Sequence, residues 1–290
     1  MPAEFALDKR RIRTNFARAA NRYEMAAVLS REVCSRMLER LDLVRLDPAH
    51  VLDAGSGTGL AARSLAQRYP HAQITRVDLS LPMLQVEQRA ASWAGALRGI
   101  FGRTAGAAVC ADFERLPIRN AAMDLVVSNL ALHWSSAPEL TLAELQRVLR
   151  RGGLLMFSTL GPDSLAELRE AAGEQRVHEF ADMHDLGDML VAAGFAAPVM
   201  EAERVTLLYA DGAALLADLR ASGQTCALAV RTGQPRRGLA GRAFLATLQE
   251  RLTAQRRDGK LPVSYEVVYG HAWKAAPKRT ADGRSVVKIF

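Results

Sequence analysis

One nine-residue stretch constrains the fold more than any other part of this chain. Residues 51–59 read VLDAGSGTG, so an apolar segment runs into glycines at positions 55, 57 and 59 before a helical pattern begins. Glycine admits positive φ angles and lets a ligand approach the backbone where a Cβ would block it. A strand, a glycine-rich turn and a helix in this order predict the first unit of an open α/β sheet, which binds ligands beyond the carboxyl ends of its strands.

The pattern after this turn predicts the rest of the sheet. From residue 50 to about residue 158, apolar strand-like runs alternate with helical periodicity, and this order is typical of a parallel sheet with helices on both faces. We predict a Rossmann-like α/β domain over residues 49–290, with a mostly parallel seven-stranded sheet and helical insertions near residues 162–193 and 211–260. Residues 1–48 have apolar positions at three- and four-residue spacing, which predicts an N-terminal helical cap.

Composition restricts the class of protein further. The chain has 290 residues, of which 49% are hydrophobic, and this is enough for a sizeable core. Its three cysteines, Cys34, Cys110 and Cys226, are far apart and form no C-x-x-C pair, so neither a disulfide framework nor a metal site is indicated. No apolar run approaches the roughly 20 residues that cross a bilayer. A protein of the reducing cytoplasm, without a membrane span, fits these features best.

Charge is unevenly distributed along the chain. The formal net charge is +7, and residues 211–290 carry more than this total because residues 151–210 are acidic. The basic C-terminal part is either a solvated surface or a docking face for an acidic partner. The second reading points to basic residues around one expected loop and helix, namely Arg236, Arg237, Arg251, Arg256, Arg257 and Lys260.

The glycine-rich turn is compatible with two kinds of nucleoside cofactor. A dinucleotide fingerprint that starts at Gly55 would need Gly or Ala at position 60, where this chain has Leu60. The stretch instead resembles the first motif, D-x-G-x-G-x-G, of the class I methyltransferases. This resemblance implies that S-adenosyl-L-methionine is bound by Asp53, Gly55, Gly57 and Gly59, although a helix-capping role for Asp53 stays open.

Acidic residues also follow the second and third expected strands. Asp78 can accept hydrogen bonds from both ribose hydroxyls of a nucleoside, a role that a nicotinamide cofactor would equally allow. The resemblance implies that Asp112 accepts from the adenine amino group, that the backbone N–H of Phe113 meets a ring nitrogen, and that Leu79 and Met83 pack against adenine and ribose.

The fourth expected strand ends in residues 129–134, NLALHW. Enzymes that methylate exocyclic base amines carry an Asn/Asp-Pro-Pro-aromatic turn here, and its absence argues against that class. We assign Asn129 to the cofactor site. His133 and Trp134 either pack at the end of a core strand or line the methyl-transfer pocket.

Five further stretches resemble one particular family, the malonyl-acyl carrier protein O-methyltransferases of early biotin synthesis. They are residues 16–23 (FARAANRY), 129–134 (NLALHW), 157–169 (FSTLGPDSLAELR), 215–223 (LLADLRASG) and 265–273 (YEVVYGHAW). Together they span nearly the whole chain. One departure follows Gly223, where the family usually has an Asn and this chain reads QTC.

The resemblance implies methyl transfer to the free carboxylate of a malonyl thioester, carried by acyl carrier protein or by coenzyme A. A carboxyl group with a reference pKa near ~4 is ionised at neutral pH, so no general base is required and no catalytic dyad is expected. Tyr23 would close over the methyl donor, and Arg169 and Arg220 are candidates for holding the malonyl or phosphopantetheine end. No nucleic acid, membrane or metal enters this interpretation.

Two other functions remain open at this point. The chain could methylate a small free acid, such as a trans-aconitate-like substrate, or it could be a non-catalytic assembly factor or RNA-binding protein, which only the basic C-terminal part supports. The N-terminal helices are expected to form a lid over the cofactor. A chain that starts near Asp47 should then fold around its sheet but turn over slowly.

Overall fold

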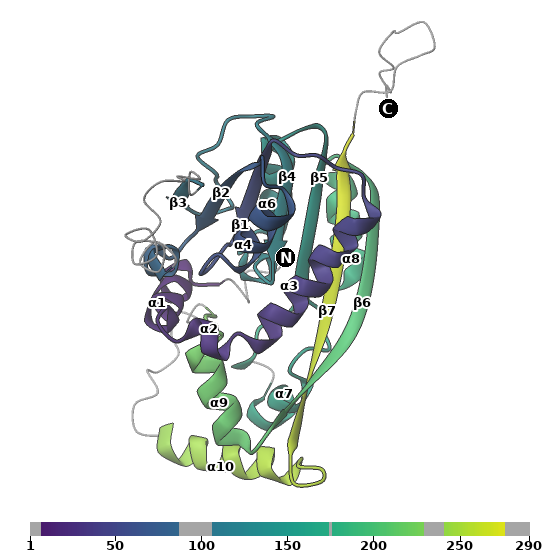
Figure 1. Cartoon of the computed structure of the whole chain (residues 1–290). Helices are drawn as coiled ribbons and strands as arrows, with labels where there is room; N and C mark the ends of the chain where they lie inside the picture. Colours follow the sequence, from purple (N-terminus) through teal and green to yellow (C-terminus); the bar gives the residue numbers. More distant parts are fainter. Residues whose placement is uncertain (1–6, 87–105, 174–175, 229–240, 276–290) are drawn as a thin grey trace, which may run out of the picture.

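The computed structural model describes residues 7–86, 106–173, 176–228 and 241–275. At its centre lies a seven-stranded sheet in the order β3-β2-β1-β4-β5-β7-β6 (Figure 1). Strands β1 to β5 run parallel, while β7 is antiparallel to both β5 and β6. The strands are β1 (His50–Ala54), β2 (Gln73–Asp78), β3 (Ala108–Cys110), β4 (Met123–Asn129), β5 (Leu149–Leu160), β6 (Phe195–Tyr209) and β7 (Leu261–Lys274). The predicted fold class is therefore confirmed.

The two faces of the sheet bury separate hydrophobic cores. Successive side chains of a strand point to opposite faces, so Val51 and Leu125 lie in one core while Leu52 and Val126 lie in the other. The first core includes residues of α3, α4, α9 and α10, and the second includes residues of α6 and α8.

The helices cover the sheet and its carboxyl edge. They are α1 (Lys9–Ala19), α2 (Tyr23–Ala26), α3 (Val28–Glu39), α4 (Leu60–Arg68), α6 (Pro138–Val148), α7 (Ala166–Ala172), α8 (Met183–Ala192), α9 (Gly212–Ala221) and α10 (Gly241–Ala254), with 3-10 turns η2 (Arg40–Leu43) and η3 (Leu132–Trp134). A further helical segment runs from Leu81 to Val86, where the first described range ends. None of the helices in the described ranges is both long and apolar enough to cross a membrane.

The expected insertions divide into two kinds of element. Within residues 162–193, α7 packs against β7 and α10, whereas α8 packs against β6 and α6 as the crossover helix that follows β5. Within residues 211–260, α9 contacts α10 as well as α1 and α2. A glycine near each end of α9 allows these close contacts. A Cβ on Gly212 would meet Leu252 of α10, and a Cβ on Gly223 would meet Phe16 of α1.

Candidate functional site

A pocket lies at the carboxyl ends of the central strands, and residues of α1 and α2 cover it. It encloses about 540 Å³ of unfilled space, a figure that includes its opening to solvent. Ten of its lining residues were predicted from the sequence: Tyr23, Gly55, Gly57, Asp78, Leu79, Met83, Asp112, Phe113, Asn129 and Trp134. Five were not: Lys9, Ile12, Phe16, Leu130 and Ala131.

The glycine-rich turn has the positive φ angles that its sequence predicts. Gly55 has a φ of +76°, and a Cβ there would lie 2.3 Å from the Cβ of Ala131. Gly57 has a φ of +54°, and its N–H donates to Asp78 Oδ2 at 2.8 Å. Gly59, with a φ of +87°, precedes the first residue of α4 and does not line the pocket.

Asp53 is fully buried below this turn. Its Oδ2 accepts a hydrogen bond from the Ala62 N–H at 3.0 Å, so the carboxylate fixes the first turn of α4 and benefits from the positive end of the helix dipole. Asp53 also lines a second, smaller cavity with Ser56 and Thr58, which shares Tyr23 and other residues with the main pocket. Asp53 therefore both anchors the helix and lies next to the main pocket.

Asp78 connects the two loops that flank the pocket. Besides the Gly57 N–H, it accepts a hydrogen bond from the Ser80 N–H at 2.8 Å. Burial raises the pKa of Asp78 to about 6, although these two backbone hydrogen bonds oppose the shift. The side chain is still mainly a carboxylate at neutral pH, and its oxygens can accept further hydrogen bonds from a ligand.

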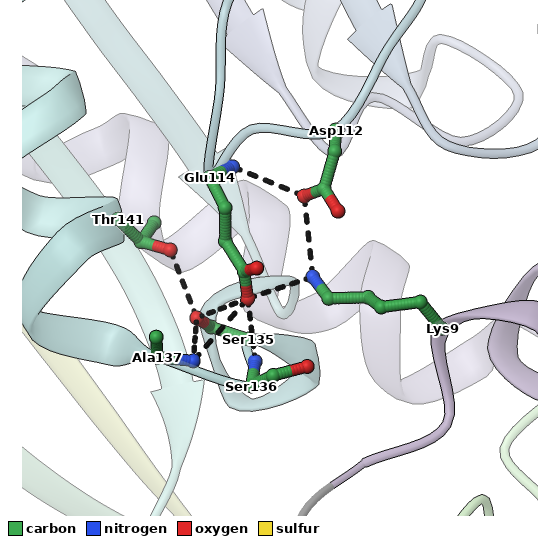
Figure 2. Close-up of polar contacts among 7 residues, drawn as sticks. All are labelled: Lys9, Asp112, Glu114, Ser135, Ser136, Ala137 and Thr141. Carbon is green, nitrogen blue, oxygen red and sulfur yellow. Dashed lines mark hydrogen bonds and ion pairs between the residues drawn. The ribbon is translucent and has the colours of Figure 1, made fainter.

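Asp112 has a cationic partner that the sequence analysis missed. Its Oδ1 accepts from Lys9 Nζ at 3.2 Å and from the Glu114 N–H at 3.0 Å (Figure 2). Lys9 Nζ also lies 5.1 Å from the centre of the Phe113 ring. Helical spacing is the sequence signal that could have identified Lys9. It lies three residues before Ile12 and seven before Phe16, so all three share one face of a helix.

Glu114 extends this cluster to the loop after η3. Its Oε1 pairs with Lys9 Nζ at 2.8 Å, and it accepts from the Ser135 hydroxyl at 2.9 Å and the Ser136 N–H at 2.6 Å (Figure 2). Burial by itself would raise the pKa of Glu114, but Lys9 and the loop hydrogen bonds outweigh it and hold the pKa below its ordinary value. Lys9 thus links the start of α1 to the loop that follows Trp134.

Asn129 links three parts of the site. Its side-chain amide donates to the Ser30 carbonyl at 3.0 Å and accepts from the Ser158 hydroxyl at 2.9 Å. The same hydroxyl accepts from the Leu130 N–H at 3.0 Å, which holds Leu130 at a φ of +47°. These hydrogen bonds fix the turn after β4 against α3 and β5.

Tyr23 lines both cavities from α2. Its hydroxyl lies 3.3 Å from the Ser30 hydroxyl. Burial is the main cause that raises the pKa of Tyr23, and the Asp78 carboxylate adds to it, while the Ser30 hydrogen bond acts in the opposite direction. Tyr23 is therefore a neutral phenol that covers the pocket from above the glycine-rich turn.

Trp134 and His133 lie in different environments although they are neighbours. Trp134 lines the pocket and makes edge contacts with Phe16 and with His178, at ring-centre distances of 5.3 Å and 4.8 Å. His133 is outside the lining set and contacts Phe180 and the Thr159 hydroxyl. Burial lowers the pKa of His133 to about 3, so its imidazole is neutral at physiological pH.

Neither of the two arginines assigned to the substrate lines the pocket. Arg169 Nη2 lies 3.3–3.4 Å from the carbonyl oxygens of Pro162, Ser164 and His178, and so supports the segment that carries His178. Arg220 is exposed at the C-terminal end of α9, near the helices that cover the pocket.

Comparison with known proteins identifies the family. A model described as a methyltransferase domain matches residues 52–157. A malonyl-[acyl-carrier protein] O-methyltransferase of Gallionella capsiferriformans is 51% identical over 98% of this chain and 97% of its own length. That of Laribacter hongkongensis is 50% identical over 100% of this chain and 98% of its own. The chain belongs to this family. The family resemblance found in the sequence is therefore confirmed over almost the full length.

Solved structures share the fold at low sequence identity. A Bacillus halodurans protein described as a methyltransferase has a TM-score of 0.60 at 17% identity and covers 84% of this chain and 99% of its own. A phosphoethanolamine N-methyltransferase of Haemonchus contortus, solved with S-adenosylhomocysteine, has a TM-score of 0.53 at 15% identity, over 83% of this chain and 53% of its own. These likenesses support the methyltransferase fold, while the relatives of higher identity define the family.

Proposed function

We propose that this chain is an S-adenosyl-L-methionine-dependent O-methyltransferase that converts the free carboxylate of malonyl-acyl carrier protein to its methyl ester, an early step of biotin synthesis. The observation that carries the proposal is the pocket itself. Within a chain of this family, the carboxylates of Asp78 and Asp112 lie at neighbouring strand ends and line one pocket together with apolar side chains.

The residues present fit the proposed cofactor. Asp78 would accept from the ribose hydroxyls, and Asp112 with the Phe113 N–H would bind the adenine edge. Leu79 and Met83 offer the apolar surface for the ring and the ribose. When bound, this cofactor supplies an electrophilic methyl group on a sulfonium.

The chain's own residues then position the nucleophile and exclude water. A malonyl carboxylate is already ionised at neutral pH, so the site has to align one oxygen with the methyl group and remove water from it. Tyr23 and Trp134, which close the pocket, are proposed for this task. His133, whose pKa of about 3 makes it unsuitable as a base near neutral pH, is proposed to position Trp134 and the adjoining wall. Arg220, on the helix α9 that contacts α1 and α2, is proposed to meet the phosphopantetheine arm, and Arg169 to hold the wall that includes His178.

One assay tests the proposed function directly. Transfer of labelled methyl from S-adenosyl-L-methionine is measured in parallel on malonyl-carrier protein, malonyl-coenzyme A, free malonate and trans-aconitate. We expect the carrier substrate to have the highest kcat/KM and the free acids to show no turnover. Faster turnover on a free acid would replace the proposed substrate with a small acid, and no turnover on any of the four would contradict the proposal.

A variant connects the assay to the site. Asp78→Ala removes two charge-assisted hydrogen bonds, each worth about 1.5–3 kcal/mol, so cofactor affinity should fall by at least about tenfold while the fold is retained. Calorimetry of a folded variant measures this, and an unchanged affinity would remove Asp78 from the cofactor site.

We also propose that the protein works in the cytoplasm, in keeping with its free cysteines, of which Cys110 and Cys226 are exposed.

A further inference from the structure

The solvent-exposed charged side chains of α1 are all basic. Residues 9–22 contain six lysine and arginine residues and no acidic residue. Lys9, Ile12 and Phe16 point into the pocket from one side of the helix. Four arginines of the helix are exposed to solvent, and the turn after it adds a fifth; this set, here called the arginine face, is Arg10, Arg11, Arg13, Arg18 and Arg22.

These arginines differ from others on the same molecule. Several arginines elsewhere form ion pairs with carboxylates: Arg36, Arg40, Arg63, Arg68, Arg147, Arg150 and Arg204. Among the described residues, the arginine face has no ion pair, and its one side-chain hydrogen bond runs from Arg11 to the Leu228 carbonyl at 3.2 Å. Within the described part of the chain, no carboxylate pairs with this positive charge.

The position of the arginine face next to the pocket gives this charge a use. An α-helix with its side chains is about 10–12 Å thick, so a partner bound to the outer side of α1 is one helix diameter from the pocket that the inner side lines. A flexible arm that carries a small acyl group could reach the pocket from there. Helix α9 contacts both α1 and α2 beside this region, and Arg220 near its C-terminal end is exposed (Figure 1).

The basic C-terminal part is less well placed for the same task. Arg251 donates to the Ala171 carbonyl and Arg256 to the Gly259 carbonyl, while Arg257 and Lys260 lie in the turn before β7. The contacts of Gly212 and Gly223 place α10 at the opposite end of α9 from α1, about 15 Å away for a ten-residue helix (Figure 1). Arg236 and Arg237 lie outside the described residues.

We propose that the arginine face is the docking surface for an acidic carrier protein whose prosthetic arm delivers the malonyl group to the pocket. The inference rests on the proposed function, because it takes the carrier as the source of the substrate.

A basic amphipathic helix can also bind an anionic membrane, but that mode needs a free apolar side. The apolar side of α1 is buried here, with Ile12 and Ala19 each at most 3% exposed.

Charge reversal on the two surfaces tests the proposal with a matched control. Arg10→Glu/Arg18→Glu alters the arginine face, and Arg257→Glu/Lys260→Glu makes the same change in charge before β7.

Steady-state kinetics use malonyl-carrier protein and malonyl pantetheine, which has the thioester arm without the acidic protein. We expect the first variant to raise the KM for the carrier substrate by at least about tenfold and to remove most of its salt dependence, with kcat and the constants for malonyl pantetheine within about twofold. The control variant should change neither substrate by more than about twofold.

Binding measured without turnover separates this proposal from the proposed function. Fluorescence anisotropy of labelled carrier protein gives an affinity that does not depend on methyl transfer. Carrier that binds the wild type, loses affinity for Arg10→Glu/Arg18→Glu and is not methylated would support the docking surface and contradict the proposed function. Carrier that is methylated and binds both proteins equally would contradict the docking surface alone. Equal losses on both substrates, a loss only in the control variant, or arginine-dependent binding to anionic vesicles with an unchanged carrier KM would each overturn it.

Discussion

Helices α1 and α3 are separated in the sequence only by the short α2, but they depend on different parts of the molecule. α1 buries two residues, Ile12 and Ala19, and of these Ile12 lies in a small cluster with Trp134 and Ala227. α3 buries six, including Val33 and Met37, which lie in the large core between the sheet and its covering helices. The region expected to be a single lid therefore consists of a cover over the pocket and a helix of the main core.

The difference lies in what holds each helix. α1 is attached by the Lys9 ion pairs, by the Asp8 N–H, which donates to the Ala227 carbonyl at 2.8 Å, and by the Asn15 amide, which donates to the Thr225 carbonyl at 3.3 Å. Such a helix can detach locally at a low free energy, whereas α3 can leave only when the core opens. Changes in α1 should therefore alter binding and turnover, and changes in α3 should alter the free energy of unfolding.

Deletion of the helices gives the largest expected effect. A chain without residues 1–46 lacks Val33, Met37 and Leu41, all fully buried, and should show no cooperative unfolding transition, because domains are stable by only about 5–15 kcal/mol. A chain without residues 1–26 keeps α3 and should fold, with kcat/KM reduced at least about 100-fold because water reaches the pocket. Thermal unfolding followed by circular dichroism and the methyl-transfer assay measure both. A cooperative transition in the shorter chain would show that α3 is dispensable for the core.

Single truncations in the two helices should show the same contrast on a smaller scale. Met37→Ala leaves a cavity in the main core and should cost about 2–5 kcal/mol of unfolding free energy. Ile12→Ala should cost less than about 1 kcal/mol, because local detachment of α1 limits the loss, but it should raise the KM for S-adenosyl-L-methionine. Urea unfolding and steady-state kinetics provide the two quantities. Equal losses of stability would mean that α1 and the core unfold as one unit.

The pH dependence of cofactor binding tests whether the cover controls Asp78. Burial raises the pKa of Asp78 to about 6, so the folded protein favours the neutral acid, and this contribution to stability is lost as the pH rises through about 6. In the proposed cofactor site, the carboxylate form of Asp78 would accept hydrogen bonds from both ribose hydroxyls. The Kd for the cofactor should thus be constant above about pH 7 and rise by about tenfold per pH unit well below 6.

Two variants are matched to this measurement. Deletion of residues 1–26 should expose Asp78, return its pKa toward the ordinary value and move the inflection to lower pH. Asp78→Asn should bind weakly, with no inflection near pH 6. Calorimetric titrations from pH 5 to 8 show the outcome, and an inflection that is unchanged by the deletion would mean that α1 and α2 do not cause the shift.

Loss of the Lys9 ion pairs gives the smallest expected effect. The side chains of Lys9, Asp112 and Glu114 are 20–29% exposed to solvent. Lys9→Met should therefore lower the free energy of unfolding by no more than about 1 kcal/mol. The expected result is cofactor dissociation that is about two- to fivefold faster, because the start of α1 is held less firmly. Arg10→Met is the control, since Arg10 is on the same helix but points to solvent. Stopped-flow dissociation rates measure both, and identical rates in the two variants would remove Lys9 from the closure of the pocket.

Local signals explain why most of the pocket was predictable. The glycines, Asp78 and Asp112 each follow a strand in a parallel sheet, and parallel strands bring their carboxyl ends to one edge. Lys9 and Ile12, which were missed, come from a helix whose position over that edge depends on contacts more than 100 residues away. His133 and Arg169 were assigned to the site from the sequence, but neither lines the pocket. The His133 side chain contacts Thr159, and the Arg169 side chain contacts carbonyl oxygens of its own segment.

The sequence by itself determined the order of strands and helices, the glycine-rich turn and the family, because these depend on local conformation and on patterns within a few tens of residues. Only the tertiary structure decided which N-terminal helix belongs to the core and which arginines are left without a carboxylate partner among the described residues. Amphipathic spacing indicates that a helix buries one side but does not say against what. Burial, local pKa shifts and charge compensation arise from residues distant in the chain that folding brings within a few ångströms.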